Sequence, residues 1–338
     1  MNIAILGAGA WGSALAKSLC EAPQGHRVLL WGRDPALMAT LAHTRSNARY
    51  LPDITLPTTL QFTADWRAAM AHAAGADALV IVATSVAGLR PTLQRLSTAT
   101  EAGIIWLCKG LEEGSRLLPH QIAEQVLGTR SRIGALSGPS FAEEVAQGLP
   151  VALTLVTRDA AFAEAAVTAL HGPRLRIYAT DDVVGVEIGG AVKNILAIAT
   201  GIVEGIGLGL NSRAAVITRG LAEVMRFGAA LGARPQTFMG LSGVGDLILT
   251  CTGALSRNRK VGLLLAEGKS LSDILAQLGH VAEGVHCAQS VQQLAQQHGV
   301  DMPIVNAVCR VLFDGIAPAA AIQGLLARDP AQEVGSRI

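Results

Sequence analysis

The pattern of apolar and polar positions divides the chain into two parts. In the first part, short apolar runs alternate with helical stretches, and the run at residues 78–83 has no polar position at all. Such a run is typical of a strand in a parallel sheet whose two faces are covered by helices. The runs lie at residues 2–6, 27–31, 78–83, 103–108, 133–137, 151–156 and 175–178. They predict an α/β fold, a Rossmann-type doubly wound sheet.

The second part begins after a hinge near residues 179–182 and shows helical periodicity without convincing strands, so we expect it to be all-helical. Its clearest helical runs are at residues 221–231, 261–266, 271–278 and 288–297. The longest apolar stretch, 188–210, contains Lys193, Asn194 and Glu204, which makes it a buried helix rather than a membrane span. The predicted domains are residues 1–182 and 183–338.

Composition sets limits on the function. A chain of 338 residues is longer than a domain with a single hydrophobic core usually is, so two domains are expected. Half of the residues (50%) are hydrophobic, which indicates a folded protein with extensive burial. The 27 basic residues nearly balance the 26 acidic ones. The sequence has no long block of basic residues of the kind that binds nucleic acid or an anionic membrane. The five cysteines are far apart and never in a C-x-x-C spacing, which indicates reduced thiols and a cytoplasmic protein, and the first residues do not resemble a signal peptide.

The strongest motif is Gly7-Ala8-Gly9-Ala10-Trp11-Gly12, a G-x-G-x-x-G pattern between an apolar strand and a helix expected from residue 13. Gly7 permits a tight turn, Gly9 lets the backbone approach a pyrophosphate, and Gly12 permits close packing of the helix. The free N–H groups of the helix would face the phosphates. An ordinary glycine turn is the alternative, but the position after the first strand favours a dinucleotide site.

The second expected strand ends in Trp31-Gly32-Arg33-Asp34, where the residue type separates NAD(H) from NADP(H). Arg33 could pair with a 2′-phosphate. Asp34 could accept a hydrogen bond from a 2′-hydroxyl, or it could simply cap the next helix. We favour NADP(H), while NAD(H) stays open.

Two further strand ends carry polar groups at the ligand-binding edge of the predicted sheet. Lys109 follows the strand at 103–108, and Gly138 and Ser140 follow the strand at 133–137. Lys109 could instead be a solvated lysine, and Ser140 could serve only as the N-cap of a helix at 141–147. Their shared edge favours contact with a substrate.

Lys193 lies in an otherwise apolar helix, next to Asn194. Burying an ammonium group costs several kcal/mol unless it is paired, and desolvation lowers a lysine pKa toward neutrality, which suits proton transfer. A partner carboxylate and a catalytic task would explain a lysine at this position, and Asp246 lies further along the chain in a glycine-rich turn. A lysine that reaches the surface remains the alternative.

Ser256, Arg257 and Asn258 open another helix and resemble an anion site, since a serine cap, free N–H groups and a guanidinium can hold a phosphate. A capped basic helix start is the alternative. The histidines near residue 280 lack a metal-ligand spacing, and we expect no metal.

Taken together, these motifs resemble the bacterial-type family of glycerol-3-phosphate dehydrogenases (NAD(P)+) along nearly the whole chain. Besides those above, the resemblance rests on Tyr50-Leu51-Pro52, Lys109-Gly110-Leu111-Glu112, Ala191-Val192-Lys193-Asn194 and Val281-Ala282-Glu283-Gly284. Ala282 stands where the family commonly has valine, a small departure.

The resemblance implies a helical domain like the C-terminal domain of 6-phosphogluconate dehydrogenases, a cytoplasmic homodimer, and a role in glycerophospholipid synthesis by reduction of dihydroxyacetone phosphate to sn-glycerol 3-phosphate. It makes Lys193 the proton acceptor or donor, which Asp246 would pair with and orient, and places Arg257 between cofactor and substrate phosphate. The implied cofactor contacts are Trp11, Arg33, Lys109, Ala142, Arg257, Val281 and Glu283. The implied substrate contacts are Lys109, Gly138, Ser140, Lys193, Asp246, Ser256, Arg257 and Asn258.

Two rival functions remain. Another reductase of the same two-domain class, a β-hydroxyacid dehydrogenase or ketopantoate reductase, would take a substrate with a carboxylate. A dinucleotide-sensing regulator would bind the cofactor without chemistry, but it would leave Lys193 and Asp246 without a task.

Overall fold

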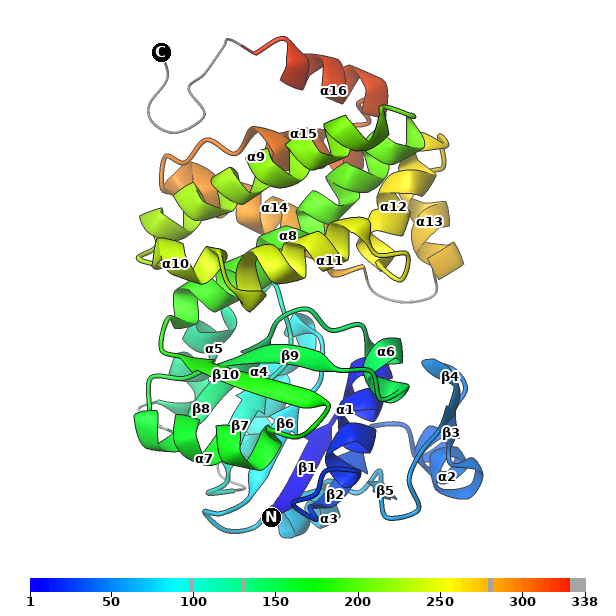
Figure 1. The fold of residues 1–338 in the computed structure, drawn as a ribbon, viewed down its shortest axis with the longest axis vertical. Helices are drawn as coiled ribbons and strands as arrows, with labels where there is room; N and C mark the ends of the chain where they lie inside the picture. The colour runs from blue at the N-terminus through cyan, green and yellow to red at the C-terminus, as the bar shows by residue number, and fades with distance from the viewer. Residues whose placement is uncertain (98–99, 129–131, 279–281, 329–338) are drawn as a thin grey trace.

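The structure is a computed structural model that describes residues 1–97, 100–128, 132–278 and 282–328, and it has two domains (Figure 1). The N-terminal domain contains a sheet with helices on both faces, and the C-terminal domain is helical throughout its described residues. The predicted fold class is therefore confirmed. The last strand ends at Thr180, and the first helix of the helical domain begins at Val183.

The main sheet has eight strands in the order β10-β9-β8-β7-β6-β1-β2-β5. Chain order reverses between β1 and β6, and this topological switch is where ligands of such sheets bind. The strands are β1 (Asn2–Leu6), β2 (Arg27–Trp31), β5 (Gln61–Thr63), β6 (Leu79–Val82), β7 (Gly103–Trp106), β8 (Ile133–Ser137), β9 (Val151–Val156) and β10 (Leu175–Thr180).

Two features of the sheet differ from the sequence prediction. β8 and β9 pair antiparallel, so the sheet is mixed rather than fully parallel. Continuous apolar runs report burial on both faces but not strand direction. The prediction also lacked the edge strand β5 and the small hairpin of β3 (Ser46–Asn47) and β4 (Leu51–Thr55). These strands are short, and β4 is largely exposed, so no apolar pattern marks them.

The helices of the N-terminal domain form two layers, because successive residues of a strand face opposite sides of the sheet. Ile3 and Ile5 face one layer, whereas Ala4 and Leu6 face the other. The first layer contains α1 (Ala10–Cys20), α2 (Pro35–Thr44) and α7 (Ala160–Leu170), and the second contains α3 (Trp66–His72), α4 (Val86–Leu96) and α5 (Pro119–Leu127). A short helix, α6 (Ala142–Ala146), packs against α1.

The helical domain is built around α8 (Val183–Gly205), which the other helices surround (Figure 1). This helix is buried along nearly its whole length. α8 is long and apolar enough to cross a membrane by composition, but it lies inside the protein, as the sequence predicted. Gly201 and Gly262 let α8 and α12 cross closely, since a Cβ at Gly262 would lie 2.1 Å from the Ile198 carbonyl oxygen. The other helices are α9 (Gly209–Ala230), α10 (Pro235–Phe238), α11 (Asp246–Thr252), α12 (Arg257–Ala266), α13 (Leu271–Leu278), α14 (Glu283–Gln297), α15 (Pro303–Phe313) and α16 (Pro318–Leu326).

Candidate active site

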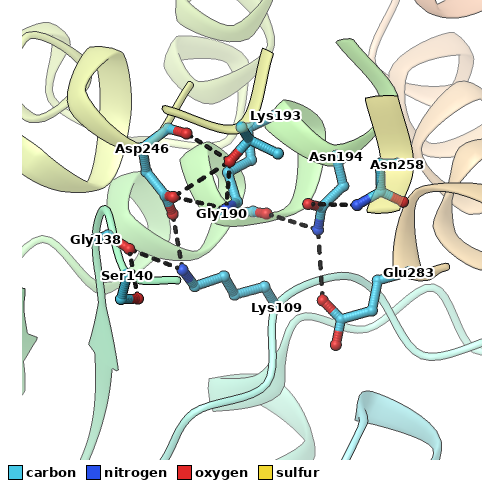
Figure 2. A network of polar contacts seen from close by, with 10 residues as sticks. Lys109, Gly138, Ser140, Gly190, Lys193, Asn194, Asp246, Asn258 and Glu283 are labelled. Atoms are coloured by element: carbon cyan, nitrogen blue, oxygen red, sulfur yellow. Dashed lines mark hydrogen bonds and ion pairs between the residues drawn. The ribbon is translucent and has the colours of Figure 1, made fainter. Parts of the chain in front are cut away.

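The site centres on the carboxylate of Asp246, which is held by two lysines from different domains (Figure 2). Lys193 Nζ lies 2.6 Å from Oδ1, and Lys109 Nζ lies 2.7 Å from Oδ2. Asp246 is 1% exposed and Lys193 8%. The ion pair predicted between Lys193 and Asp246 is therefore present, and Lys193 does not reach the surface as the alternative required.

Local backbone geometry brings Asp246 to Lys193. Asp246 begins α11 directly after the tight turn of residues 241–245, in which Gly243 is not helical. This turn reaches α8 because Gly189 has no side chain: a Cβ there would lie 2.4 Å from the Ser242 carbonyl oxygen. Lys193 also donates to Thr250 Oγ1 at 2.9 Å, one turn further along α11. The lysine thus has two partners on one helix.

The charges of the three groups shift one another. Burial lowers the pKa of Lys193 from 10.5 to about 8, an effect that Lys109 reinforces and Asp246 opposes. Burial alone would raise the pKa of Asp246, but the ammonium groups of Lys109 and Lys193 outweigh it and hold that pKa below its ordinary value. Asp246 is therefore an anion, and Lys193 can gain or lose a proton near neutral pH.

Lys109 connects this centre to the end of β8. Its Nζ donates to the Gly138 carbonyl oxygen at 3.1 Å, and Gly138 has a φ of +131°, which favours glycine. The Ser140 hydroxyl donates to the same carbonyl oxygen at 3.0 Å. The alternative in which Ser140 serves only as an N-cap is wrong, because α6 begins at Ala142 with Phe141 as its N-cap and no side-chain cap.

A second polar group lies beside the first and joins three helices (Figure 2). Asn258 of α12 donates to Asn194 Oδ1 at 3.0 Å, and Asn194 donates to Glu283 Oε2 at 3.5 Å. Asn258 Oδ1 accepts from the Gly284 backbone N–H at 3.0 Å, a contact that closes α14 against α12. Burial raises the pKa of Glu283, although Lys109, Lys193 and Arg257 oppose the shift.

Ser256 and Arg257 lie at the start of α12. The Ser256 hydroxyl accepts from the Arg259 backbone N–H at 3.2 Å, so the serine cap predicted from the sequence is confirmed. Arg257 is the first residue of the helix and its side chain is exposed. A guanidinium beside a helix N-terminus is suited to an anion.

The glycine-rich turn fits a dinucleotide. Gly7 has a φ of +133°, and a Cβ at Gly12 would lie 2.0 Å from the Gly7 carbonyl oxygen. A Cβ at Gly9, in contrast, would meet no protein atom within 4 Å. Gly7 and Gly12 are thus required by the turn itself, whereas Gly9 borders open space at the N-terminus of α1, where backbone N–H groups are free.

The predicted cofactor contacts Trp11, Arg33 and Ala142 belong to the α/β domain. Trp11 and Ala142 border one small apolar cluster between α1 and α6. Arg33 is exposed at the end of β2, and Asp34 caps α2 by accepting from the backbone N–H groups of Ala36 and Leu37. Helix α1 begins at Ala10, three residues before the prediction. Val281 lies outside the described residues.

Comparison with protein families decides which kind of enzyme carries this arrangement. Residues 2–163 match the model described as NAD-dependent glycerol-3-phosphate dehydrogenase N-terminus, and residues 182–323 match the corresponding C-terminus. The chain belongs to the NAD-dependent glycerol-3-phosphate dehydrogenase family. The resemblance identified from the sequence is therefore confirmed.

Individual members of this family agree with the assignment. The chain is 62% identical to the glycerol-3-phosphate dehydrogenase (NAD(P)+) of Paucimonas lemoignei, covering 98% of each chain. It is 60% identical to that of Herminiimonas arsenicoxydans, covering 99% of this chain and all of the other. The crystal structure of the Coxiella burnetii glycerol-3-phosphate dehydrogenase superposes with a TM-score of 0.90 at 39% identity, over 96% of this chain and 98% of that one.

The rival reductases are more distant. A 2-dehydropantoate 2-reductase from Geobacter metallireducens superposes with a TM-score of 0.58 at 16% identity, over 94% of this chain and all of the other. At that identity the likeness concerns the fold alone. The two-domain architecture is therefore shared with ketopantoate reductases, whereas the sequence motifs belong to the glycerol-3-phosphate dehydrogenase family.

Two residues that shape the site were not predicted from the sequence. Thr250, the second partner of Lys193, and Asn194, which ties Asn258 to Glu283, were not named as site residues. Asn194 follows Lys193 in the chain, and Thr250 lies one helical turn after Asp246, the spacing at which two side chains share a helix face. That spacing is the signal that could have identified Thr250.

Proposed function

We propose that this protein catalyses the reversible reduction of dihydroxyacetone phosphate to sn-glycerol 3-phosphate. The observation that carries the proposal is Lys193, a buried ammonium group paired with Asp246 at 2.6 Å, whose pKa is lowered to about 8. The nicotinamide cofactor, when bound, supplies the hydride that reaches C2 of the ketone. The chain must supply the proton and hold the substrate.

Lys193 is the proton donor in this proposal. Its ammonium group gives a proton to the oxygen at C2 as negative charge develops there, and in the reverse direction the neutral amine takes that proton back. Asp246 orients the lysine, together with Thr250. Lys109 contributes a second positive charge from the other domain and contacts both ligands, with Gly138 and Ser140 beside it.

The start of α12 binds the substrate phosphate. Arg257 offers an exposed guanidinium, and Ser256 and the free N–H groups of the first turn add hydrogen-bond donors. Asn258 is held by Asn194 and Gly284, so that its position is fixed before substrate arrives. Anchoring the phosphate at one point orients the carbonyl group and supplies proximity.

Residues 1–182 bind the cofactor and residues 183–338 bind the substrate in this proposal. The remaining cofactor contacts are Gly7, Gly9, Trp11, Gly12, Arg33, Ala142, Val281 and Glu283. NADP(H) is preferred over NAD(H), because Asp34 is engaged in capping α2 and leaves Arg33 as the charged group at the end of β2. An arginine there pairs with a 2′-phosphate.

We place the enzyme in the cytoplasm, as a homodimer that provides the backbone of glycerophospholipids. All five cysteines are free, and most are buried, which fits a reducing compartment. Among the described residues no group of three or more His, Cys, Asp and Glu side chains could hold a metal ion. The proposed reaction uses no metal.

The deciding experiment measures oxidation of NADPH with dihydroxyacetone phosphate and, in parallel, with ketopantoate and a β-keto acid. We expect kcat/KM for dihydroxyacetone phosphate to be at least about 100-fold higher than for ketopantoate or the β-keto acid, because the carboxylate of a keto acid does not reach the phosphate site. Turnover of ketopantoate alone would support the rival reductase. Tight binding of NADPH without turnover of any ketone would support a dinucleotide-sensing regulator.

A further inference from the structure

Glu187 lies in the same helix as Lys193, but its carboxylate accepts hydrogen bonds from the other domain. Oε1 accepts from Trp106 Nε1 at 3.0 Å and from the His120 backbone N–H at 3.0 Å, and Oε2 lies 2.6 Å from His120 Nδ1. All three residues are buried, with Glu187 5%, His120 6% and Trp106 1% exposed. A buried carboxylate with this many donors is anchored in one position.

The two partners of Glu187 belong to different elements of the α/β domain, and one of them lies close to Lys109 in the chain. Trp106 is the last residue of β7, and the chain continues from it to Lys109. His120 lies in the first turn of α5, whose free backbone N–H groups and positive dipole end favour an anion. Glu187 thus caps a helix of the α/β domain from within the helix that carries Lys193.

Apolar side chains also join the domains at this point, since Val183 and Val186 of α8 pack into a core cluster of the α/β domain. A cavity of only about 10 Å³ lies between Glu187 and Lys109, and it is lined by residues of both domains, including Ser137 and Val186. The buried Ser137 hydroxyl has no hydrogen-bond partner among the described residues. The hydrogen bonds of Glu187 add fixed donor–acceptor distances to this packing and so define how α8 lies against the end of β7.

We propose that Glu187, His120 and Trp106 form an interdomain clamp and that Glu187 is a positioning residue of the reaction. The clamp holds α8 against the end of β7, so that Lys193 and Lys109 both reach the carboxylate of Asp246. Glu187 touches none of the reacting groups and acts through the placement of the two lysines. The inference rests on the proposed function, in which Lys193 transfers the proton.

The chain contains a matched control for this role. Glu223 of α9 is 1% exposed and likewise caps a helix, accepting from the backbone N–H groups of Ile304 at 2.7 Å and Val305 at 3.3 Å. Its partner is α15, inside the helical domain. Glu187→Gln and Glu223→Gln therefore both remove a buried capping charge, but only the first removes one that joins the domains.

The test compares steady-state kinetics of these two variants with the unmodified enzyme. We expect Glu187→Gln to lower kcat at least about tenfold and to move the apparent pKa of kcat/KM away from about 8, with the KM of NADPH within about twofold. Glu223→Gln should keep kcat within about twofold. An unchanged kcat in Glu187→Gln, or an equal loss in both variants, would overturn the clamp.

Two substitutions of His120 keep the test decisive if Glu187→Gln folds poorly. His120→Asn retains an amide donor near the position of Nδ1 and should keep most of the activity, whereas His120→Leu removes the donor and should lose activity as Glu187→Gln does. Equal activities of the two His120 variants would contradict the proposal.

Hydrogen exchange separates the clamp from the proposed function, because it needs no turnover. Glu187→Gln should speed amide exchange in the first turn of α5 and around residues 179–182, and Glu223→Gln should not. An unmodified enzyme inactive on dihydroxyacetone phosphate would refute the proposed function alone. Unchanged exchange in Glu187→Gln would refute the clamp.

Discussion

Lys109 and Lys193 come from different domains and contact opposite oxygens of one carboxylate, at 2.7 and 2.6 Å. Two cations therefore share a single buried anion, Asp246. In the proposed mechanism, the two ammonium groups carry more charge than this one carboxylate offsets, which favours a developing alkoxide and a phosphorylated substrate. The proton of Lys193 is also easier to remove than that of an ordinary lysine, because burial and the nearby charge of Lys109 both lower its pKa.

The first prediction concerns pH. Because burial lowers the pKa of Lys193 to about 8, kcat/KM for oxidation of glycerol 3-phosphate should rise with pH up to about 8 and then level off, since the neutral amine is the base. Reduction of the ketone needs the ammonium form, so its kcat/KM should fall above that pH. Initial rates in both directions between pH 6 and pH 10 provide the measurement. Identical pH profiles in the two directions would contradict the assignment.

The second prediction concerns the choice of cofactor. Arg33→Ala removes the guanidinium at the end of β2, so the KM of NADPH should rise at least about tenfold while that of NADH changes little. The control is Arg67→Ala, which removes an exposed arginine of α3, a helix on the other face of the sheet from α1 and α2. If the KM of NADPH stays unchanged in Arg33→Ala, Arg33 does not recognise the 2′-phosphate.

The third prediction separates two glycines of the same turn. Gly9→Ala should leave thermal stability nearly unchanged, because its Cβ meets no protein atom within 4 Å, yet it should weaken NADPH binding at least about tenfold by occupying the phosphate site. Gly12→Ala places a Cβ 2.0 Å from the Gly7 carbonyl oxygen and should lower stability as well. Thermal unfolding and fluorescence titration with NADPH measure the two effects. Normal NADPH affinity in Gly9→Ala would exclude the turn as the phosphate site.

The fourth prediction concerns stability away from the site. Burial raises the pKa of Glu223 from 4.5 to about 7, so the folded state holds this proton more tightly than the unfolded state. Its contribution to stability is therefore present below pH 4.5 and is lost as the pH rises through about 7. Relative to the unmodified protein, Glu223→Gln should gain up to about 3 kcal/mol in unfolding free energy between pH 4 and pH 8. A constant difference between the two proteins across this range would contradict the shift.

Much of the fold follows from local apolar patterning. Each strand predicted from an apolar run is present, because a buried parallel strand needs consecutive apolar residues. The antiparallel pairing of β8 with β9 was not predictable, since strand direction depends on how the connecting segment crosses the sheet. The hairpin of β3 and β4 escaped prediction as well, although Asn47 in it donates to the Ala8 carbonyl oxygen of the glycine-rich turn.

The candidate site was predictable where a charged residue stands in an apolar segment, because burying an unpaired charge is energetically unfavourable. Lys193 in an apolar helix signals a partner, and the structure provides Asp246. Glu187 stands in the same apolar helix, but its partners Trp106 and His120 lie about 70 residues or more away in the sequence, and no pattern links them. Contacts of this kind depend on how the two domains meet, which the sequence motifs do not record.

The most direct test of the account is the kcat of Lys193→Ala with dihydroxyacetone phosphate and NADPH, measured together with the Kd of NADPH. Lys260→Ala, an exposed lysine of α12, is the control. We expect Lys193→Ala to lower kcat by a factor on the order of 10³ or more while the Kd of NADPH stays within about threefold, since the lysine moves the proton and does not hold the cofactor. A kcat close to that of the unmodified enzyme would show that Lys193 is not the proton donor.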